Sequence, residues 1–382
     1  MTEQLKTMLD RAAAQHFDPV DVDAITAAGD RTVRRRRVAA GVAGVAVLAV
    51  IGGTVAALAG SGDDKADFSD DPGFRTDVPM WTEGSVLHTP EATYELGVDV
   101  FTFVRTSEGI VFTGQISEER LGVYSFTGEG DPDKIGETED PHLRSDPDGP
   151  YAGWLDQSGD RPEAVVIDQG SGDRVWSAPA KLSFSFPIVA IDGSSVYLAD
   201  ADEHPTHLVD LVTGEDVVLG DDGLGFVDVE GDLSAYLLED ADGAELGLEI
   251  RSDDRGVVEI RFGVDGLGVL SPGGRWISVG ADDVSVYDTA TGASVDLGAT
   301  DAIPGMGIAW ADRDTMLVVA QTAEALVLMS CEVPSGECEE LTTFDDFSTL
   351  FAVPDSDLLW MLRGESGGLT VESSEVSASE AG

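Results

Sequence analysis

Few residues in this sequence are of the types that commonly carry out catalysis. The 382 residues include only two cysteines and five histidines. The chain has no Gly-x-Ser-x-Gly elbow, no His-Glu-x-x-His pair and no phosphate-binding glycine loop, so the usual linear motifs of hydrolases, metalloproteases and nucleotide-binding proteins are missing. We therefore predict no catalytic residues and no cofactor. An extracytoplasmic hydrolase or lyase with a site assembled from scattered residues stays an alternative.

Basic residues are also scarce. The chain has 22 Lys and Arg residues against 73 Asp and Glu residues, a net charge of −51. Residues 1–37 hold seven of the basic residues and six of the acidic ones, which leaves a net charge of −52 beyond residue 37. Such a surface repels phosphate backbones, so we do not expect this part of the chain to bind nucleic acid. A hydrophobic content of 42% still allows a buried core.

Charged residues are absent from one long stretch near the N-terminus. Residues 38–60 contain no charge over 23 positions. A helix of that length spans about 34 Å, enough to cross a hydrocarbon core of about 30 Å. Arg34–Arg37 precede the stretch and Asp63 and Asp64 follow it. Because the basic side stays in the cytoplasm, the sequence predicts a single-pass membrane protein with residues 61–382 outside the cytoplasm.

Two alternatives concern this N-terminal region. Ala57-Leu58-Ala59 matches the cleavage site of a signal peptide, in which case the hydrophobic stretch is removed. Residues 1–37 form the predicted cytoplasmic tail, in which Leu5, Met8 and Leu9 lie at helical spacing. Such a tail either docks on a partner or on the membrane surface, or it is disordered. If it docks on a sigma-factor-like protein, the whole chain is a transmembrane regulator.

Beyond the hydrophobic stretch, the strongest pattern is a repeated β-hairpin. Each copy has an alternating β-branched strand, a polar turn with glycine and a second short strand. The copies are residues 165–176, 208–220, 248–260, 286–298 and 328–341. The aligned turn glycines are Gly130, Gly172, Gly214, Gly256, Gly292 and Gly336. They are 42, 42, 42, 36 and 44 residues apart.

Two further strands fit between successive hairpins, and four strands per roughly 42 residues is the period of a β-propeller blade. We therefore predict an all-β, seven-bladed β-propeller, with six blades as the alternative, preceded by one transmembrane α-helix and a short helical cytoplasmic tail. The seventh blade is expected to be composite, with inner strands from the C-terminal segments 349–355 and 358–364 and outer strands from 78–89 and 92–97. The predicted regions are the tail 1–37, the helix 38–60, an acidic linker 61–77, the propeller 78–372 and a disordered C-terminal tail 373–382.

Two turns carry a family resemblance. SPGGRWISV (271–279) and SDPDGPYAGWL (145–155) resemble the Ser-Pro-Asp-Gly-aromatic turns of WD-repeat-like and TolB-type β-propellers. The order of tail, arginine cluster, anchor and propeller is similar to that of largely uncharacterised membrane-anchored propeller proteins of actinobacteria. Gly273 stands where the family pattern has Asp, and the Gly-His and Trp-Asp pairs of eukaryotic WD repeats are missing. The resemblance implies the fold and no particular activity.

Cys331 and Cys338 flank the turn of the last hairpin. Two cysteines on facing strands of an extracytoplasmic hairpin come within bonding distance, so we predict a disulfide, with a pair of free thiols as the alternative. The six tryptophans fall on predicted strands and are expected in the core between blades.

A weak candidate metal site consists of Asp200, Asp202, His204 and His207. Imidazoles and carboxylates at this spacing are ligands for zinc or a similar cation, although solvated turns of an acidic protein have the same composition. A weak possibility of Ca²⁺ binding rests on the runs around Gly243 and before Gly149, neither of which matches a twelve-residue calcium loop.

The predicted function is a non-catalytic, membrane-tethered binding or sensing module for a protein, peptide or envelope component, with no nucleic-acid partner.

Overall fold

We describe a computed structural model of the chain. It describes residues 74–117, 120–180, 188–199, 206–219, 225–239, 245–252, 254–261, 267–280, 284–297, 309–321, 325–344 and 351–355. All of these belong to one compact unit, Asp70–Gly382. The predicted cytoplasmic tail, the predicted membrane helix and the C-terminal tail lie outside the described residues. Within the described residues, no helix is long and apolar enough to span a membrane.

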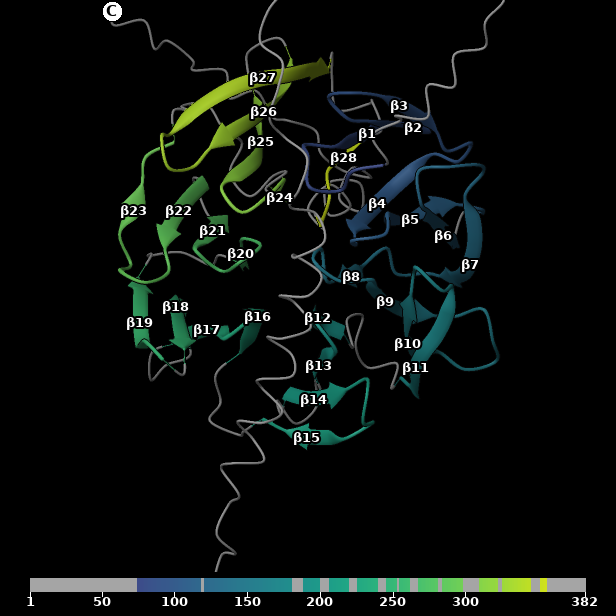
Figure 1. Cartoon of the computed structure of the whole chain (residues 1–382), viewed down its shortest axis with the longest axis horizontal. Helices are drawn as coiled ribbons and strands as arrows, with labels where there is room; N and C mark the ends of the chain where they lie inside the picture. Colours follow the sequence, from purple (N-terminus) through teal and green to yellow (C-terminus); the bar gives the residue numbers. More distant parts are fainter. Residues whose placement is uncertain are drawn as a thin grey trace, which may run out of the picture. The chain divides into compact units, whose positions relative to one another are not determined.

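The described strands form seven four-stranded antiparallel sheets arranged in a ring (Figure 1). Blade 1 contains β4 (Val100–Arg105), β5 (Ile110–Gln115), β6 (Leu121–Phe126) and β7 (Asp133–Thr138). Blade 2 contains β8 (Leu143–Ser145), β9 (Tyr151–Asp156), β10 (Glu163–Asp168) and β11 (Asp173–Pro179). Blade 3 contains β12 (Ile188–Asp192), β13 (Ser195–Ala199), β14 (Thr206–Asp210) and β15 (Asp216–Val218).

Blades 4 to 7 continue around the ring. Blade 4 contains β16 (Phe226–Glu230), β17 (Leu233–Glu239), β18 (Glu245–Ser252) and β19 (Gly256–Arg261). Blade 5 contains β20 (Leu267–Leu270), β21 (Trp276–Gly280), β22 (Val284–Asp288) and β23 (Ser294–Val295). Blade 6 contains β24 (Ala309–Trp310), β25 (Thr315–Gln321), β26 (Leu326–Glu332) and β27 (Glu337–Phe344). Blade 7 contains β28 (Phe351–Ala352), β1 (Trp81–Glu83), β2 (Val86–His88) and β3 (Thr93–Glu95).

The predicted fold class is confirmed for the propeller, including the number of blades. The first strands of neighbouring blades contact one another, which places them innermost, and the glycine hairpins form the two outer strands of each of blades 1 to 6. All six turn glycines have a positive φ, between 69° and 80°. A side chain at these positions would be strained, which explains why glycine marks every outer hairpin.

Blade 7 is composite, as predicted, but its strands are divided differently. The C-terminal strand β28 pairs with β1 through Thr82↔Ala352 and Glu83↔Phe351. The N-terminal segment then supplies three strands instead of the expected outer two, because Gly84, at φ 60°, turns the chain inside residues 78–89. Residues 358–364, predicted as a second inner strand, lie outside the described residues.

The core lies between the blades. One buried cluster joins Val104 and Val111 of blade 1 to Trp154 of blade 2, and another joins Trp276 of blade 5 to Trp310 of blade 6. These three tryptophans are buried, as the sequence predicts. In blade 1, a Cβ on Gly136 would lie 2.9 Å from the Trp154 ring, so the absence of a side chain there makes room for the indole.

Candidate functional site

The turns between the first and second strands of the blades lie close together. We call these turns in blades 1 to 6, together with the strand-end acids Asp192 and Glu230, the first-turn cluster, comprising residues 106–109, 146–150, 192–194, 230–232, 271–275 and 311–314. Ser107 N donates to Gly149 O at 2.8 Å, joining blade 1 to blade 2. Arg313 of blade 6 lies 3.8 Å from the carboxylate of Asp148 in blade 2. Because these two blades are not neighbours in the ring, their first turns meet across it.

Within this cluster, carboxylates form hydrogen bonds across three successive blade junctions. Asp146 Oδ2 of blade 2 accepts from Gly193 N of blade 3 at 2.9 Å. Asp192 Oδ1 of blade 3 accepts from Gly231 N of blade 4 at 3.3 Å.

Glu230 Oε1 of blade 4 accepts from Gly273 N of blade 5 at 2.7 Å. All three donor glycines have a positive φ, so each turn presents its N–H to the preceding blade in a conformation that other residues rarely adopt. Each acid therefore fixes the position of the next blade.

Burial, with the crowding of carboxylates, raises the pKa of two acids in the cluster. Burial, with repulsion from Asp192, Asp148 and Asp146, raises the pKa of Glu230 to about 7, although the bond from Gly273 opposes the rise. Burial also raises the pKa of Asp146, against the hydrogen bonds that it accepts. Asp148 remains 61% exposed and faces solvent beside Arg313. The cluster is therefore a negatively charged surface that a cationic group would neutralise.

A further acid with a raised pKa lies on the innermost strand of blade 4. Asp228 on β16 accepts backbone hydrogen bonds from Val229 N and from Leu270 N of blade 5, both at 2.8 Å. Burial raises its pKa to about 6, while these bonds and the charge of Arg144 on β8 lower it. Arg144 Nε donates to Val189 O of blade 3 at 2.9 Å. The hydrogen bonds join the inner strands of blades 4 and 5 and those of blades 2 and 3, and the charge of Arg144 acts between the two pairs.

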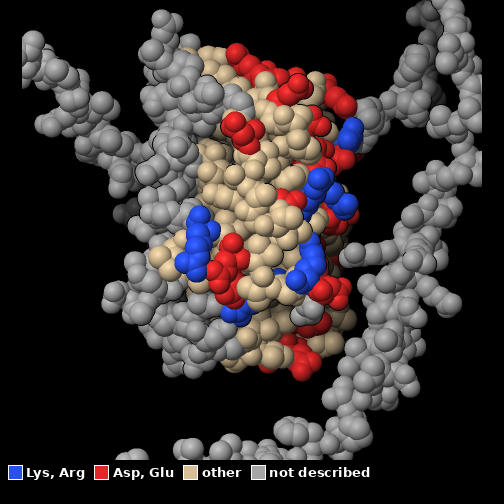
Figure 2. Space-filling model, turned by 90° about the vertical axis from the view of Figure 1, so that its left-hand side faces the viewer, with Lys and Arg blue, Asp and Glu red and all other residues tan. Residues whose placement is uncertain are grey.

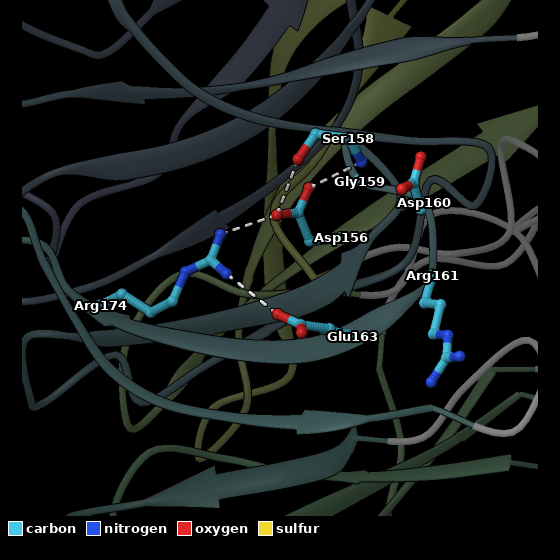
Figure 3. Close-up of a pocket in the computed structure, with 7 residues that line it drawn as sticks. All are labelled: Asp156, Ser158, Gly159, Asp160, Arg161, Glu163 and Arg174. Atoms are coloured by element: carbon cyan, nitrogen blue, oxygen red, sulfur yellow. Dashed lines mark hydrogen bonds and ion pairs between the residues drawn. The ribbon is translucent and has the colours of Figure 1, made fainter.

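A hollow of about 390 Å³ opens beside blade 2, between the β9–β10 turn and β11 (Figure 3). Arg174 donates to Asp156 at 2.7 Å and to Glu163 at 3.3 Å. Burial alone would raise the pKa of Asp156, but the hydrogen bonds from Glu137 N, Ser158 and Arg174 outweigh it and lower the pKa. The Asp156 carboxylate is thus fully used in holding the turn, and we assign the hollow no ligand.

The predicted metal site is largely outside the described residues, which include only His207 of its four members. His207 Nδ1 lies 3.0 Å from Asp216 Oδ1 on the neighbouring strand β15. Within the ranges that the structure describes, no group of three His, Cys, Asp or Glu residues is placed to hold a metal ion. The site at Asp200, Asp202, His204 and His207 stays a prediction.

The weak calcium candidate before Gly149 has a different role. Asp146 Oδ1 accepts from Asp148 N at 2.9 Å, and its other oxygen accepts from the next blade. Asp146 is buried, and both of its carboxylate oxygens bond to backbone N–H groups. This acid therefore holds the turn and the blade junction. The run around Gly243 lies almost entirely outside the described residues.

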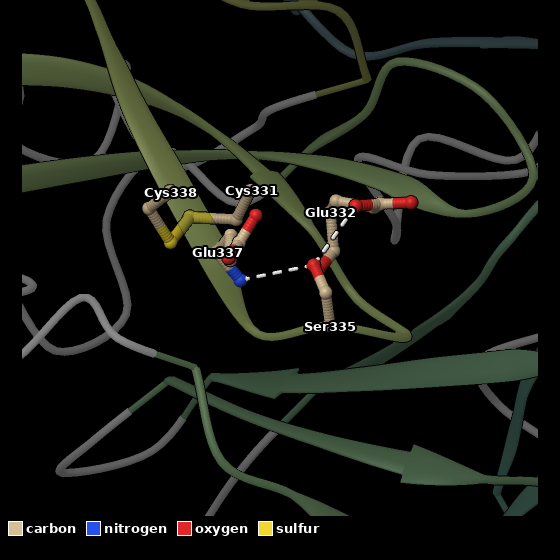
Figure 4. Close-up of a disulfide and its surroundings, with 5 residues drawn as sticks. All are labelled: Cys331, Glu332, Ser335, Glu337 and Cys338. Carbon is tan, nitrogen blue, oxygen red and sulfur yellow. Dashed lines mark hydrogen bonds between the residues drawn. A yellow bond between two sulfur atoms is a disulfide. The ribbon is translucent and has the colours of Figure 1, made fainter.

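The two cysteines form a disulfide across the outer hairpin of blade 6 (Figure 4). Cys331 on β26 lies directly opposite Cys338 on β27. Ser335 in the intervening turn donates to Glu332 at 2.8 Å and accepts from Glu337 N at 3.2 Å. The predicted disulfide is therefore present in the structure.

The carboxylate junctions were missed in the sequence. Asp192 and Glu230 received no role, because an isolated acid in a turn has no evident partner. A signal was available, since Asp192-Gly193 and Glu230-Gly231 repeat the same acid–glycine pair at the end of a first strand. The glycine whose N–H donates to each acid lies 39 to 47 residues further along the chain. Aligning first strands instead of hairpin glycines would have exposed the pattern.

Comparison with known proteins places the chain by its fold. It is similar to the β-propeller domain of the Trilobed protease from Pyrococcus furiosus, with a TM-score of 0.50 and 12% identity over 68% of this chain and 87% of the other. That propeller is described as having an open velcro topology, whereas here β28 pairs with β1.

Other solved structures show weaker similarity. TolB from Acinetobacter baumannii gives a TM-score of 0.39 and 13% identity, over 69% of this chain and 68% of that one. U3-55K gives a TM-score of 0.42 and 13% identity, over 64% and 81%. No protein family matches the sequence, and no curated protein matches it either. The comparisons therefore agree with the fold alone, a seven-bladed β-propeller.

Proposed function

We propose that this protein is a non-catalytic, membrane-tethered binding or sensing module whose propeller recognises a basic group of a peptide, protein or envelope component at the first-turn cluster. The observation that carries the proposal is the convergence of Asp146, Asp148, Asp192 and Glu230 from three blades, where burial, with repulsion from the other three acids, raises the pKa of Glu230 to about 7. A bound ammonium or guanidinium group would relieve this repulsion. Turns presented by a rigid ring suit recognition.

The tether and the location outside the cytoplasm rest on sequence features. The uncharged segment 38–60 follows Arg34–Arg37, which favours a cytoplasmic N-terminus. The Cys331–Cys338 disulfide supports an oxidising compartment for the propeller, since disulfides are rare in the cytosol.

Binding of a compact cation tests the site. The full chain in non-ionic detergent is titrated into labelled tri-arginine amide at 150 mM salt, and fluorescence anisotropy gives the Kd. Removing two charges by Asp192→Asn with Glu230→Gln should weaken binding at least tenfold. Binding by the unaltered chain should strengthen between pH 5.5 and pH 8, as Glu230 ionises.

The matched control is Glu95→Gln with Glu339→Gln, which removes the same charge from exposed positions on β3 and β27. Its Kd should stay within twofold of the unaltered chain. Equal weakening by both pairs would mean that only the overall charge attracts the peptide, and the site assignment would then be wrong.

A further inference from the structure

The outer hairpin of blade 3 concentrates exposed apolar side chains. Seven large hydrophobic residues are exposed in the part of the chain that the structure describes, and four of them belong to this hairpin: Val212, Val217, Val218 and Leu219. The other three are distributed singly over blades 1, 2 and 4. Single exposed residues are ordinary on a protein surface, whereas a contiguous group marks an interaction site.

Among the described strands, none pairs with the outer edge of β15 in the same hairpin. Leu219 N donates to Thr206 O at 2.8 Å, and Asp210 N donates to Glu215 O at 2.9 Å. In an antiparallel pair the bonded residues alternate with unbonded ones. Since β15 pairs with β14 in register through Val209↔Asp216 and His207↔Val218, the N–H and C=O groups of Asp216 and Val218 point away from β14, to the outer edge of the blade.

Three of the other six outer strands carry a Lys, Arg or Pro that hinders pairing with another chain, whereas β3, β23 and β27 carry none. Lys134 lies on β7, Arg174 and Pro179 lie on β11, and Arg261 lies on β19. Positive charges and proline are the usual protection of a sheet edge. On β15 the only charged residue is Asp216, followed by two valines. This edge is therefore open to strand addition.

Charge indicates which strand would fit. Residues 188–219 contain seven carboxylates and no Lys or Arg. By contrast, the side of the propeller that carries β19 and β23 shows basic side chains among acidic ones (Figure 2). A second copy of a chain with a net charge of −51 would be repelled at blade 3. A basic segment would be attracted.

We propose that β15 binds an extended, basic, valine- or isoleucine-rich segment of a partner protein, which adds to blade 3 as a fifth strand. The partner's backbone pairs with Asp216 and Val218, its apolar side chains cover the exposed valines, and its basic side chains face the carboxylates of blade 3. This surface is separate from the first-turn cluster, so the proposal does not depend on the function proposed above.

A labelled heptapeptide of alternating lysine and valine is the probe. The full chain in non-ionic detergent at 150 mM salt should bind it with a micromolar Kd by fluorescence anisotropy. Val218→Lys should weaken binding at least tenfold, because it replaces the apolar contact with a repelling charge. The matched control is Val257→Lys on β19, since Val257 is 59% exposed and Val218 is 54% exposed. It changes the net charge equally and should leave the Kd within twofold.

Two comparisons test the backbone pairing. A peptide methylated on alternate backbone nitrogens keeps the charge but cannot pair along one edge, and it should bind at least tenfold more weakly. Val218→Pro removes the outward N–H and should have a similar effect, with a thermal melt confirming that the variant folds.

Three results would overturn the proposal: no binding, equal weakening by Val218→Lys and Val257→Lys, or full binding by the methylated peptide. Sedimentation that shows self-association of the unaltered chain, abolished by Val218→Lys, would assign the edge to a second copy instead.

Discussion

Glu230 has two opposing effects on the propeller. Its carboxylate bonds to Gly273 N and so positions blade 5, yet it lies in a group of acids that repel one another. The unfolded chain releases this proton near the usual pKa of 4.5, and the folded chain releases it only near 7. Stability due to this group is therefore lost as the pH rises from about 4.5 to about 7 and stays lost above that.

We expect Glu230→Gln to raise the melting temperature at pH 8 and to leave it nearly unchanged at pH 4.5. The amide oxygen still accepts from Gly273 N, and the repulsive charge is gone. Thermal melts from pH 4.5 to pH 8 measure the difference.

Asp210→Asn is a control for which the expected change in melting temperature has the opposite sign. Hydrogen bonds from Thr213 N, the Thr213 hydroxyl and Val212 N lower the pKa of Asp210, so its stabilising effect is present above the ordinary pKa of 3.8 and is lost at lower pH. The variant should melt lower than the unaltered chain at pH 8. A Glu230→Gln variant that loses stability at pH 8 would contradict the assigned repulsion.

Arg105 is a buried cation that contacts the segments where the ring closes. Its guanidinium donates to the carbonyl oxygens of Thr76 at 3.0 Å, Ala311 and Trp310, and it lies 4.0 Å from the carboxylate of Asp355. Burial lowers the pKa of this group, opposed by Asp355 and the other nearby acids. One side chain thus bonds to blade 6 and to the segment before β1, beside the end of β28.

Arg105→Lys should lower the free energy of unfolding by at least about 2 kcal/mol, because a single ammonium cannot reach all three carbonyls and an unpaired buried group costs about 1–3 kcal/mol. Urea unfolding measures the change. Arg261→Lys, at an exposed position on β19, should stay within about 0.5 kcal/mol. Equal losses in the two variants would rule out the closing role of Arg105.

At the scale of elements, the hairpin of blade 6 is the one with a covalent bond between its strands. The Cys331–Cys338 disulfide closes a short loop with a sequence separation of 7. Replacing both cysteines with alanine should lower the free energy of unfolding by about 2 kcal/mol, since the loop is short. Guanidinium unfolding measures this loss. Reducing the unaltered chain should produce a similar loss and should not affect the double variant further.

Hairpins could be predicted from the sequence because their signals are local. An outer hairpin such as β18–β19 needs only alternating apolar residues and one glycine at positive φ, here Gly256, and all of these lie within about a dozen residues. The division of blade 7 could not be predicted in the same way, since Thr82 and Ala352 pair in space but lie at opposite ends of the propeller sequence. The acid–glycine contacts between blades are intermediate in how well the sequence predicts them, because the two partners lie one blade apart in the chain.

At the scale of the whole molecule, the orientation in the membrane stays a prediction that fusion reporters can test. Alkaline phosphatase joined after Gly382 and expressed in a bacterial host should be active, since that enzyme needs an oxidising compartment. The fusion should also remain with the membrane fraction. An inactive fusion would place the propeller in the cytoplasm, and a soluble fusion that starts after Ala59 would favour the cleaved signal peptide.

The composite blade also determines how the ring responds to mechanical load. A pull on the chain upstream of Phe74 enters the propeller at the segment before β1, where it meets the ring contacts of Phe74 with Tyr94 and Phe126 and then the bond between Thr76 O and Arg105. Next in line is the ladder of two residue pairs that joins β1 to β28. Each of the other six blades is built from four strands that follow one another in the chain. Under force the ring would therefore open at blade 7, where the two ends of the circle meet.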